Sequence, residues 1–259
     1  MITVNISTDS PLKESAELVK RLVSKESFAR GRELVLNVSD TVSLQVADTG
    51  ITSNVFEIDL FADKLLWRLN HSGKNSEAVC RAVIGRLSHP KVFDATAGLG
   101  RESIILQNAG AEVTMFERNP VIWLLLLSAV HKAGSQSEIM AALKNGLPRL
   151  APLGSVAENL NRSYDFKNPD VVYYDPMFPK RTKTALVKKE MRIFHELVGY
   201  DEDTLDYANY LLTVASHHLV VKRPGGEPPL ELNVRRSSFV DGKACRFDCY
   251  FVNSGSHTD

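Results

Sequence analysis

Short apolar strands alternate with helices between residues 76 and 222, and this alternation restricts the fold more than any other feature of the sequence. Apolar runs predict strands over 91–94, 112–117, 171–174 and 219–222. Helical periodicity and end signals predict helices over 76–87, 101–109, 119–134 and 204–215, with another inside 184–197. Strands that feed helices in this order form a parallel sheet through right-handed crossovers, and ligands bind at the carboxyl ends of its strands. The sequence therefore predicts an α/β protein with a Rossmann-like, mostly parallel sheet.

The N-terminal part of the chain follows a different pattern. Ser10 and Pro11 are suited to open a helix as its N-cap and first residue. Two alternating apolar runs, 34–38 and 42–46, are separated by polar turn residues and predict a hairpin. We therefore expect residues 1–75 to form a small α+β region.

The remaining residues, 76–259, are expected to form the Rossmann-like domain. Near its end, Asp241-Gly242 stands between two apolar runs, which is a strong signal for an antiparallel hairpin. With 259 residues and 44% hydrophobic content, the chain is long enough to bury one large core with a smaller region attached. Lysine plus arginine and aspartate plus glutamate each count 31, so any site for a polyanion has to be a local patch.

Three further features bear on the cellular setting. The N-terminus has no basic segment followed by an apolar one, and the longest apolar run, 121–127, is too short to span a bilayer. Cys80, Cys245 and Cys249 form no even set for disulfides and lack the second ligand pair of a zinc site. We therefore expect a cytoplasmic protein with reduced cysteines, no membrane contact and no metal.

The first chemical motif is VFDATAGLGRES, residues 92–103. Gly98 and Gly100 allow the backbone to approach a ligand, and the helix that follows directs free N–H groups toward it. Glu117 ends the next predicted strand 19 residues after Gly98 (117 − 98), where a carboxylate can accept hydrogen bonds from ribose hydroxyls. A plain strand-to-helix turn is the alternative for the glycine motif alone, but the pair indicates a nucleoside cofactor.

Two cofactor classes use this geometry. A dinucleotide fingerprint needs glycine or alanine at the position of Ser103, so that match is incomplete. The acidic residue ahead of the glycines, Asp94, is instead a feature of class I S-adenosylmethionine-dependent methyltransferases. The stretch resembles their first motif, except that Thr96 stands where glycine is commonest.

The stretch YYDPMFP, residues 173–179, resembles the Asp/Asn-Pro-x-aromatic motif of amino-directed methyltransferases. An exocyclic base amine is a poor nucleophile because its lone pair is delocalised, so acceptors that orient it are useful. The Asp175 carboxylate and a backbone carbonyl near Pro176 can serve as acceptors, and the prolines make this segment rigid. Phe178 is suited to stack on an unpaired base. The alternative is a proline-bracketed turn with a capping aspartate.

Five blocks carry a more specific likeness: SGKNSEAV (72–79), DATAGLGR (94–101), FERNP (116–120), DPMFP (175–179) and ALVKKEMRIFHELVG (185–199). Together they resemble the RsmJ (YhiQ) family of ribosomal small-subunit RNA guanine-N2 methyltransferases. The likeness runs from about residue 56 to the C-terminal hairpin, whereas the first 50 or so residues carry none. It implies a class I methyltransferase fold, S-adenosylmethionine as cofactor, a guanine of 16S rRNA in the small ribosomal subunit as substrate, and N2-methylguanosine as product.

The resemblance also implies roles for individual residues. Cofactor contacts are expected from Asp94, Gly98, Gly100, Arg101, Glu102, Glu117, Arg118, Gly154, Ser155 and Asp175. Catalysis is expected from Asp175, Pro176 and Phe178. Neither a metal nor a covalent enzyme intermediate is expected, because the methyl sulfonium is already activated.

A cluster of basic residues follows the DPMFP block, and phosphate contacts from such a cluster would position an RNA strand. The expected RNA-binding residues are Lys180, Arg181, Lys183, Lys188 and Lys189, with His71 and Lys74 as second contacts. The alternative is an ordinary solvated helix face.

Other functions are compatible with these residues. An adenine or cytosine amino-methyltransferase would use the same pocket, and an NAD-dependent oxidoreductase would use the same glycine motif and Glu117. A non-catalytic RNA-binding protein of ribosome assembly would retain the fold and the basic cluster. The sequence leaves the oligomeric state open.

Overall fold

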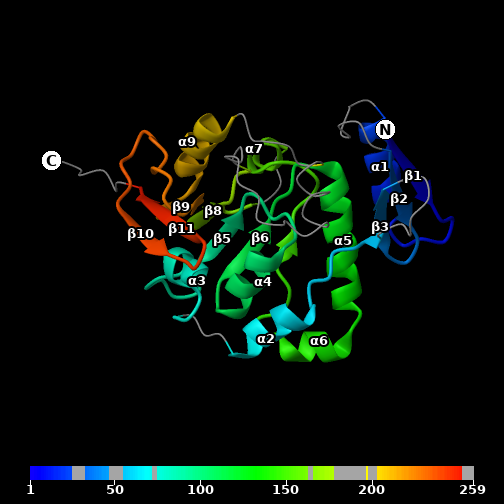
Figure 1. The fold of residues 1–259 in the computed structure, drawn as a ribbon, viewed down its shortest axis with the longest axis horizontal. Helices are drawn as coiled ribbons and strands as arrows, with labels where there is room; N and C mark the ends of the chain where they lie inside the picture. The colour runs from blue at the N-terminus through cyan, green and yellow to red at the C-terminus, as the bar shows by residue number, and fades with distance from the viewer. Residues whose placement is uncertain are drawn as a thin grey trace.

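The computed structural model describes residues 1–24, 33–46, 55–71, 75–162, 166–177, 197 and 203–252. Figure 1 shows two sheets, a small one near the N-terminus and a large one that forms the body of the molecule. In the described part of the chain, no helix is both long and apolar enough to cross a membrane.

The small sheet has four strands in the order β1-β2-β3-β4. Its elements are β1 (Ile2–Ile6), α1 (Lys13–Val23), β2 (Leu34–Val38), β3 (Val42–Val46) and β4 (Val55–Phe56). β1 pairs with β2 in parallel and the other pairs are antiparallel, so the predicted 34–46 hairpin is confirmed. The sequence analysis did not identify β1, although Ile2, Val4 and Ile6 alternate as in a strand.

The predicted start of the first helix was wrong by two residues. α1 begins at Lys13, with Leu12 as its N-cap residue. The Ser10 hydroxyl accepts a hydrogen bond from the Leu12 amide at 3.1 Å and donates one to the Ser39 carbonyl at 2.5 Å. Ser10 therefore ties the approach to α1 to the β2–β3 turn instead of capping the helix.

The large sheet has seven strands in the order β10-β11-β9-β8-β5-β6-β7. Its strands are β5 (Lys91–Asp94), β6 (Glu112–Met115), β7 (Arg149–Leu150), β8 (Val171–Tyr174), β9 (His218–Pro224), β10 (Ser238–Asp241) and β11 (Cys245–Phe251). The pairs from β7 to β9 are parallel, and β11 is antiparallel to both β9 and β10. The predicted parallel sheet and C-terminal hairpin are confirmed.

The described helices that accompany this sheet are α2 (Asp63–His71), α3 (Ala78–Val83), α4 (Arg101–Asn108), α5 (Pro120–Gly134), α6 (Ser137–Ala142), α7 (Val156–Asn161) and α9 (Thr204–Val214). α3 is shorter than the predicted 76–87 because Glu77 is extended and serves as its N-cap residue. The helix expected inside 184–197 lies outside the described residues, apart from Leu197.

Helix α5 joins the two sheets. It is apolar almost all round, which is typical of a helix buried on several sides. Figure 1 shows why: α5 lies between the large sheet and the small one, where α1 and β3 pack against it. The Ser128 hydroxyl also accepts a hydrogen bond from the Val42 amide at 2.8 Å. Residues of both sheets consequently share one hydrophobic core.

The strand order creates a switch point beside β5. From β5 the chain moves outward to β6 and β7, and then returns to β8 on the other side of β5. In open parallel sheets a ligand-binding crevice forms where the order reverses, outside the carboxyl ends of the strands. Here the residues that leave β5 and β8 border this crevice.

The turn from β5 into α4 is organised by one buried carboxylate. Asp94 is 1% exposed and accepts hydrogen bonds from the Ser103 hydroxyl at 2.5 Å and the Thr96 amide at 3.1 Å. Ser103, which breaks the dinucleotide fingerprint, therefore holds the first turn of α4 against the end of β5.

Gly100 is required for packing in this turn. Its φ is +71°, and a Cβ there would come within 2.9 Å of side-chain carbons of Leu60 and Leu126. The structure thus gives this glycine a role in helix packing that does not depend on a ligand.

Burial raises the pKa of Asp94 to about 7, against the opposing effect of its hydrogen bonds from Ser103 and Thr96. A raised carboxyl pKa stabilises the fold at low pH, and that contribution is lost as pH rises from the ordinary value of 3.8 through about 7. The difference in unfolding free energy between the wild type and Asp94→Asn should therefore fall across this interval, by up to about 1.4 kcal/mol per pH unit.

Urea unfolding of both proteins at a series of pH values measures this difference. The control is Asp9→Asn, which changes an exposed aspartate. Parallel stability curves for the wild type and Asp94→Asn would contradict a raised pKa at Asp94.

Candidate active site

Glu117 fixes the loop at the carboxyl end of β6. The residue is 7% exposed, and its carboxylate accepts hydrogen bonds from the amides of Gly98 at 3.0 Å and Asn119 at 2.8 Å. Gly98 lies in the turn after β5 and has a φ of +53°. Its bond to Glu117 holds this turn next to the end of β6. A carboxylate has about four acceptor positions, and the Gly98 and Asn119 amides occupy two of them.

Gly154 and Ser155 lie next to the backbone of Glu117. The Gly154 amide donates to the Glu117 carbonyl at 3.1 Å. Ser155 then caps α7 through a capping box with Glu158, a pattern visible in the sequence as Ser-x-x-Glu but not used to predict this helix. The structure therefore brings together Gly98, Glu117 and Gly154, as expected for one side of a nucleoside site.

The two arginines named from the sequence lie at the surface of this region. Arg118 pairs with Asp203 at 3.0 Å, and both side chains are about half exposed. Arg101 is exposed at the start of α4. Their exposure leaves them able to reach a ligand.

Asp175 directly follows β8 and is attached to the β5 turn. Its backbone amide donates to the Thr96 hydroxyl at 2.7 Å. Since β5 and β8 are neighbours, this bond crosses the switch point of the sheet. Thr96, the residue that departs from the usual glycine-rich pattern, therefore sets the position of Asp175.

Lys222 is a polar residue of the site that the sequence analysis did not identify. It lies near the end of β9, and its ammonium is 2.7 Å from an oxygen of Asp175 and 3.5 Å from an oxygen of Glu102. Burial lowers the pKa of Lys222, but the charges of Glu102 and Asp175 outweigh this effect and raise it above the ordinary value. Lys222 is therefore a fixed positive charge between two carboxylates. A signal for it existed, because Lys222 ends the apolar run of a predicted parallel strand.

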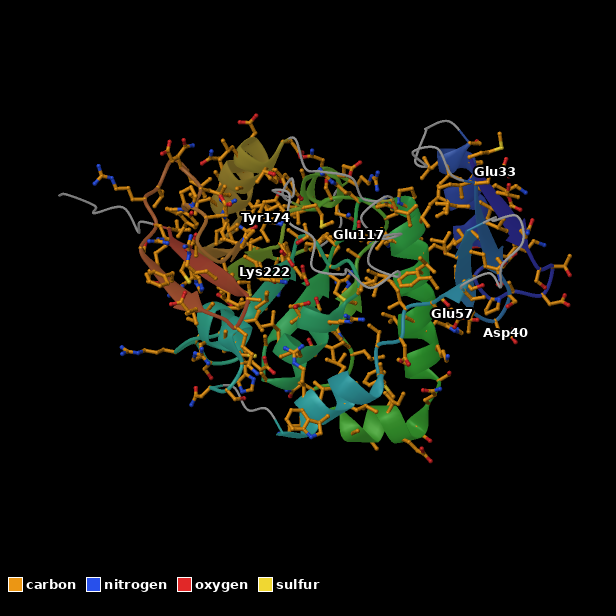
Figure 2. The ribbon with its side chains drawn as sticks, viewed as in Figure 1. Glu33, Asp40, Glu57, Glu117, Tyr174 and Lys222 are labelled. Atoms are coloured by element: carbon orange, nitrogen blue, oxygen red, sulfur yellow. The ribbon has the colours of Figure 1, made fainter. Side chains whose placement is uncertain are left out.

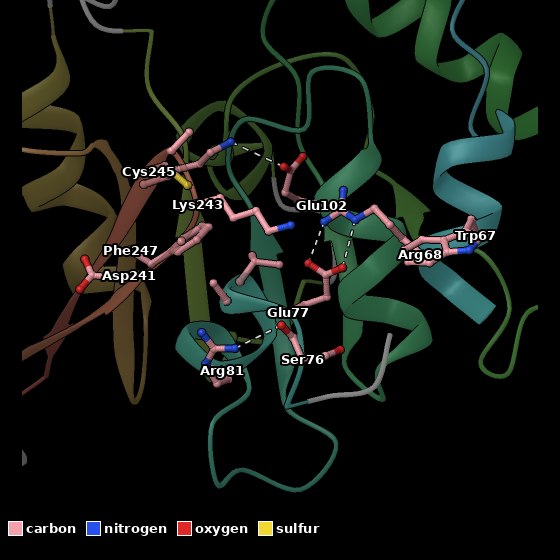
Figure 3. Close-up of a pocket in the computed structure, with 15 residues that line it drawn as sticks. Trp67, Arg68, Ser76, Glu77, Arg81, Glu102, Asp241, Lys243, Cys245 and Phe247 are labelled. Carbon is pink, nitrogen blue, oxygen red and sulfur yellow. Dashed lines mark hydrogen bonds and ion pairs between the residues drawn. The ribbon is translucent and has the colours of Figure 1, made fainter. Parts of the chain in front are cut away.

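A cleft of about 940 Å³ extends from this cluster toward the surface. Lys222 and Glu102 both line it, with the Lys222 nitrogen 3.5 Å from a Glu102 oxygen, and Figure 3 shows Glu102 among the lining residues. Trp67 and Arg68 of α2 line one side, and Lys243, Cys245 and Phe247 from the β10–β11 hairpin line another. In Figure 2, Glu117 and Lys222 both lie over the large sheet, although they belong to different strand ends.

Several residues named from the sequence cannot be placed. Phe178, Lys74, Lys180, Arg181, Lys183, Lys188 and Lys189 lie outside the described residues, and the His71 side chain is also not described. Pro176 is described and follows Asp175 as a buried residue. The cysteines are free, with Cys80 and Cys249 buried, and the described residues contain no group of three metal-ligating side chains.

This arrangement places two kinds of chemistry side by side. One part, around Gly98, Glu117 and Gly154, offers a carboxylate and backbone groups for a nucleoside. The other, around Asp175 and Lys222, offers acceptors and one cation, and Lys222 lines the cleft. The Thr96–Asp175 hydrogen bond connects them.

Comparison with known proteins gives consistent matches. The sequence profile of a SAM-dependent methyltransferase family matches residues 18–252. Ribosomal RNA small subunit methyltransferase J from Pseudoalteromonas atlantica is 42% identical over 199 residues, 76% of each chain. The protein of the same name from Pseudomonas fluorescens strain Pf0-1 is 34% identical and covers 87% of this chain and 88% of its own.

A solved structure supports the same relationship. The SAM-dependent methyltransferase NGO1261 from Neisseria gonorrhoeae superposes with a TM-score of 0.67 at 26% identity, covering 98% of this chain and 97% of its own. The chain therefore belongs to the class I S-adenosylmethionine-dependent methyltransferases and, within them, to the family of ribosomal RNA small subunit methyltransferase J.

Proposed function

We propose that this protein transfers a methyl group from S-adenosylmethionine to the exocyclic N2 amine of a guanine in 16S rRNA. The observation that carries this proposal is the position of Asp175. Its carboxylate lies at the switch point of the sheet and is linked through Thr96 to the turn that approaches Glu117. Family membership favours methyl transfer over hydride transfer with NAD, which uses a similar turn.

The residues around Glu117 have the chemistry that S-adenosylmethionine requires. The buried Glu117 carboxylate, which Gly98 ties to the β5 turn, would accept hydrogen bonds from the ribose hydroxyls. The Gly154 amide donates to the Glu117 backbone carbonyl, and Gly154 and Ser155 would contact the adenine together with Arg118. The turn from Asp94 to Arg101 and Glu102 would enclose the methionine end. When bound, S-adenosylmethionine supplies a methyl group already activated by its sulfonium charge.

Asp175 orients the amine of the base in this proposal. Its carboxylate accepts a hydrogen bond from the amine, and a backbone carbonyl near Pro176 accepts the second one. Because Thr96 holds the Asp175 backbone, the acceptors are fixed before the base arrives. Orientation of this kind contributes up to about 7–11 kcal/mol in ideal cases. After transfer, Asp175 or water takes the proton that the methylated amine loses.

The RNA would reach this site along basic residues that lie close to Asp175 and to helix α3 in the sequence. The cluster Lys180, Arg181, Lys183, Lys188 and Lys189 follows Asp175 closely in the chain, and His71 and Lys74 precede helix α3. Phosphate contacts from these residues would position the strand, and Phe178 would stack on the base. The target guanine would have to leave its own stack to enter the site.

The cofactor site predicts the effect of Glu117→Ala. Loss of the ribose acceptor should weaken S-adenosylmethionine binding by about 1–3 kcal/mol, the usual cost of leaving such partners unsatisfied. Calorimetric titration of the folded variant measures this change. The matched control Glu112→Ala removes an exposed carboxylate from the start of the same strand and should bind normally. Equal affinities for all three proteins would remove Glu117 from the cofactor site.

The role of Asp175 predicts a loss in chemistry. Asp175→Ala should slow the transfer step by about 100- to 10,000-fold at saturating RNA and cofactor. Asp175→Asn should slow it less, because an amide oxygen still accepts one hydrogen bond. Single-turnover transfer of labelled methyl, with mass spectrometry of the nucleoside formed, separates chemistry from binding.

Asp206→Ala, which changes an exposed aspartate of α9, is the control and should behave as the wild type. A transfer rate near that of the wild type in Asp175→Ala would show that Asp175 does not orient the amine and belongs only to a rigid turn. Formation of methyladenosine or methylcytidine would show that the substrate is another amino base and not guanine. No transfer by the wild type would favour a non-catalytic RNA-binding role.

A further inference from the structure

Four of the described side chains that line the cleft are cationic: Arg68, Arg81, Lys222 and Lys243. Arg68 of α2 is paired with Glu77, which accepts two hydrogen bonds from its guanidinium at 3.0 and 2.9 Å. Lys222 is paired with the two carboxylates described above. Two of the four cations therefore have carboxylate partners within the protein, and the other two are Arg81 and Lys243.

Arg81 is held in place without losing its charge. It lies in the last turn of α3 and is exposed. Its Nη1 donates to the backbone carbonyls of Asn75 at 3.0 Å and Ser76 at 3.2 Å, and Figure 3 shows the bond to Ser76. A guanidinium has five N–H donors, and no described residue accepts from its Nε or Nη2 or pairs with it as a carboxylate. Arg81 thus presents an oriented positive charge to the cleft.

Lys243 lies on another wall of the cleft, at the tip of the β10–β11 hairpin. Figure 3 shows its side chain extending from the hairpin toward the middle of the cleft, whereas the Asp241 carboxylate points away. The turn that carries it is tight, because the Gly242 amide donates to the Cys245 carbonyl at 2.8 Å. Within the described part of the chain, the Lys243 ammonium donates to no other residue. It is therefore suited to bind an anion.

An exposed aromatic ring borders the same cleft. Trp67 of α2 is 61% exposed, although Leu65 and Leu69 on either side of it are buried. Trp67 thus projects from the solvent-facing side of α2, across the cleft from the hairpin in Figure 3. Sites for single-stranded nucleic acid combine cations that contact the phosphates with aromatic rings on which bases stack. Trp67, Arg81 and Lys243 form this combination.

We propose that the cleft holds the RNA nucleotide next to the target guanosine, with its phosphate bound by Arg81 and Lys243 and its base stacked on Trp67. The proposal rests on the proposed function, because it takes rRNA as the substrate. Lys222 connects the cleft to the proposed place of reaction, since it lines the cleft and is 2.7 Å from an Asp175 oxygen. The volume of about 940 Å³ is within the range of small-molecule sites and leaves room for a nucleotide.

The charges in the cleft favour one phosphate over a long polyanion. The carboxylates of Glu77 and Glu102 each have a cation beside them, so the positive charge that lacks a protein partner is confined to Arg81 and Lys243. Glu102 stays with the cofactor in this arrangement. A base can stack on Trp67 only when it is unpaired, which fits a strand whose neighbouring guanine has left its stack. Stacking tolerates any base, so this contact would add affinity without selecting a sequence.

The experiment measures how the full-length protein binds small ribosomal subunits from cells that lack it, at a series of salt concentrations. The variants are Lys243→Met, Arg81→Gln and the double variant. Arg86→Gln and Lys132→Met are the matched controls, because each removes an exposed cation that does not line the cleft. Cofactor titration and thermal unfolding show that each variant is folded.

Each lost phosphate contact should reduce the slope of log affinity against log salt by about 0.7, the value for single strands. Lys243→Met and Arg81→Gln should each show this reduction and the double variant about twice as much, whereas both controls keep the wild-type slope. Trp67→Ala should weaken binding by about 5- to 150-fold, and Trp67→Phe should recover much of this loss because phenylalanine also stacks. S-adenosylmethionine affinity should stay unchanged in every variant.

Wild-type slopes in both Lys243→Met and Arg81→Gln would overturn the proposal, and so would wild-type affinity in Trp67→Ala. The nucleosides formed in the same subunits separate this proposal from the proposed function. Formation of N2-methylguanosine by the wild type together with unchanged slopes in the variants would overturn the role of the cleft and leave the proposed function standing. The expected slopes without any N2-methylguanosine would support RNA binding in the cleft and overturn the proposed function.

Discussion

The hydrogen bond between the Asp175 amide and the Thr96 hydroxyl is the interaction on which the site depends. It crosses from β8 to β5 at the point where the strand order of the sheet reverses. On the β5 side, Thr96 is held in turn by the buried Asp94 carboxylate, which also binds the first turn of α4 through Ser103. A displacement of the turn that approaches Glu117 would therefore displace Asp175 as well. In this way the fold fixes the position of Asp175 relative to the turn that carries Gly98.

The carboxylates of the site differ in whether a cation is close to them. Asp94 is buried and contacts no cation among the described residues, and its pKa is raised to about 7, mainly by burial. Asp175 and Glu102 are instead more exposed and share Lys222. The buried carboxylate thus serves the structure of the turn, and the two accessible ones are the groups suited to contact a ligand. The local pairing at Lys222 also fits the balanced total charge of the chain.

Much of the fold was predictable from local patterns. β5 and β8 were predicted with their observed bounds because each is a short, nearly continuous buried run. Asp241-Gly242 located the C-terminal hairpin through turn chemistry alone. The sequence analysis did not use two further local signals, the alternation in β1 and the capping box at Ser155. Ser10 was misassigned because its hydroxyl bonds to a turn 29 residues away, which no local pattern indicates.

The candidate site was predictable where it follows from position on a strand. Asp94, Glu117 and Asp175 each come at or just after a strand end, and parallel strands gather such residues at one edge. Lys222 was missed because its partners are set by the pairing of β9 with β8 and by the position of α4, both long-range features. The side chain of Phe178 and the basic cluster after it lie outside the described residues, so their roles stay predictions.

The activity to be tested is the formation of N2-methylguanosine in small-subunit rRNA by this protein. Quantitative mass spectrometry of 16S rRNA nucleosides from cells with and without the protein tests this most directly. The account predicts that loss of the protein removes N2-methylguanosine from one position, and that the wild type but not Asp175→Ala restores it. An unchanged content of N2-methylguanosine at every position would contradict the account.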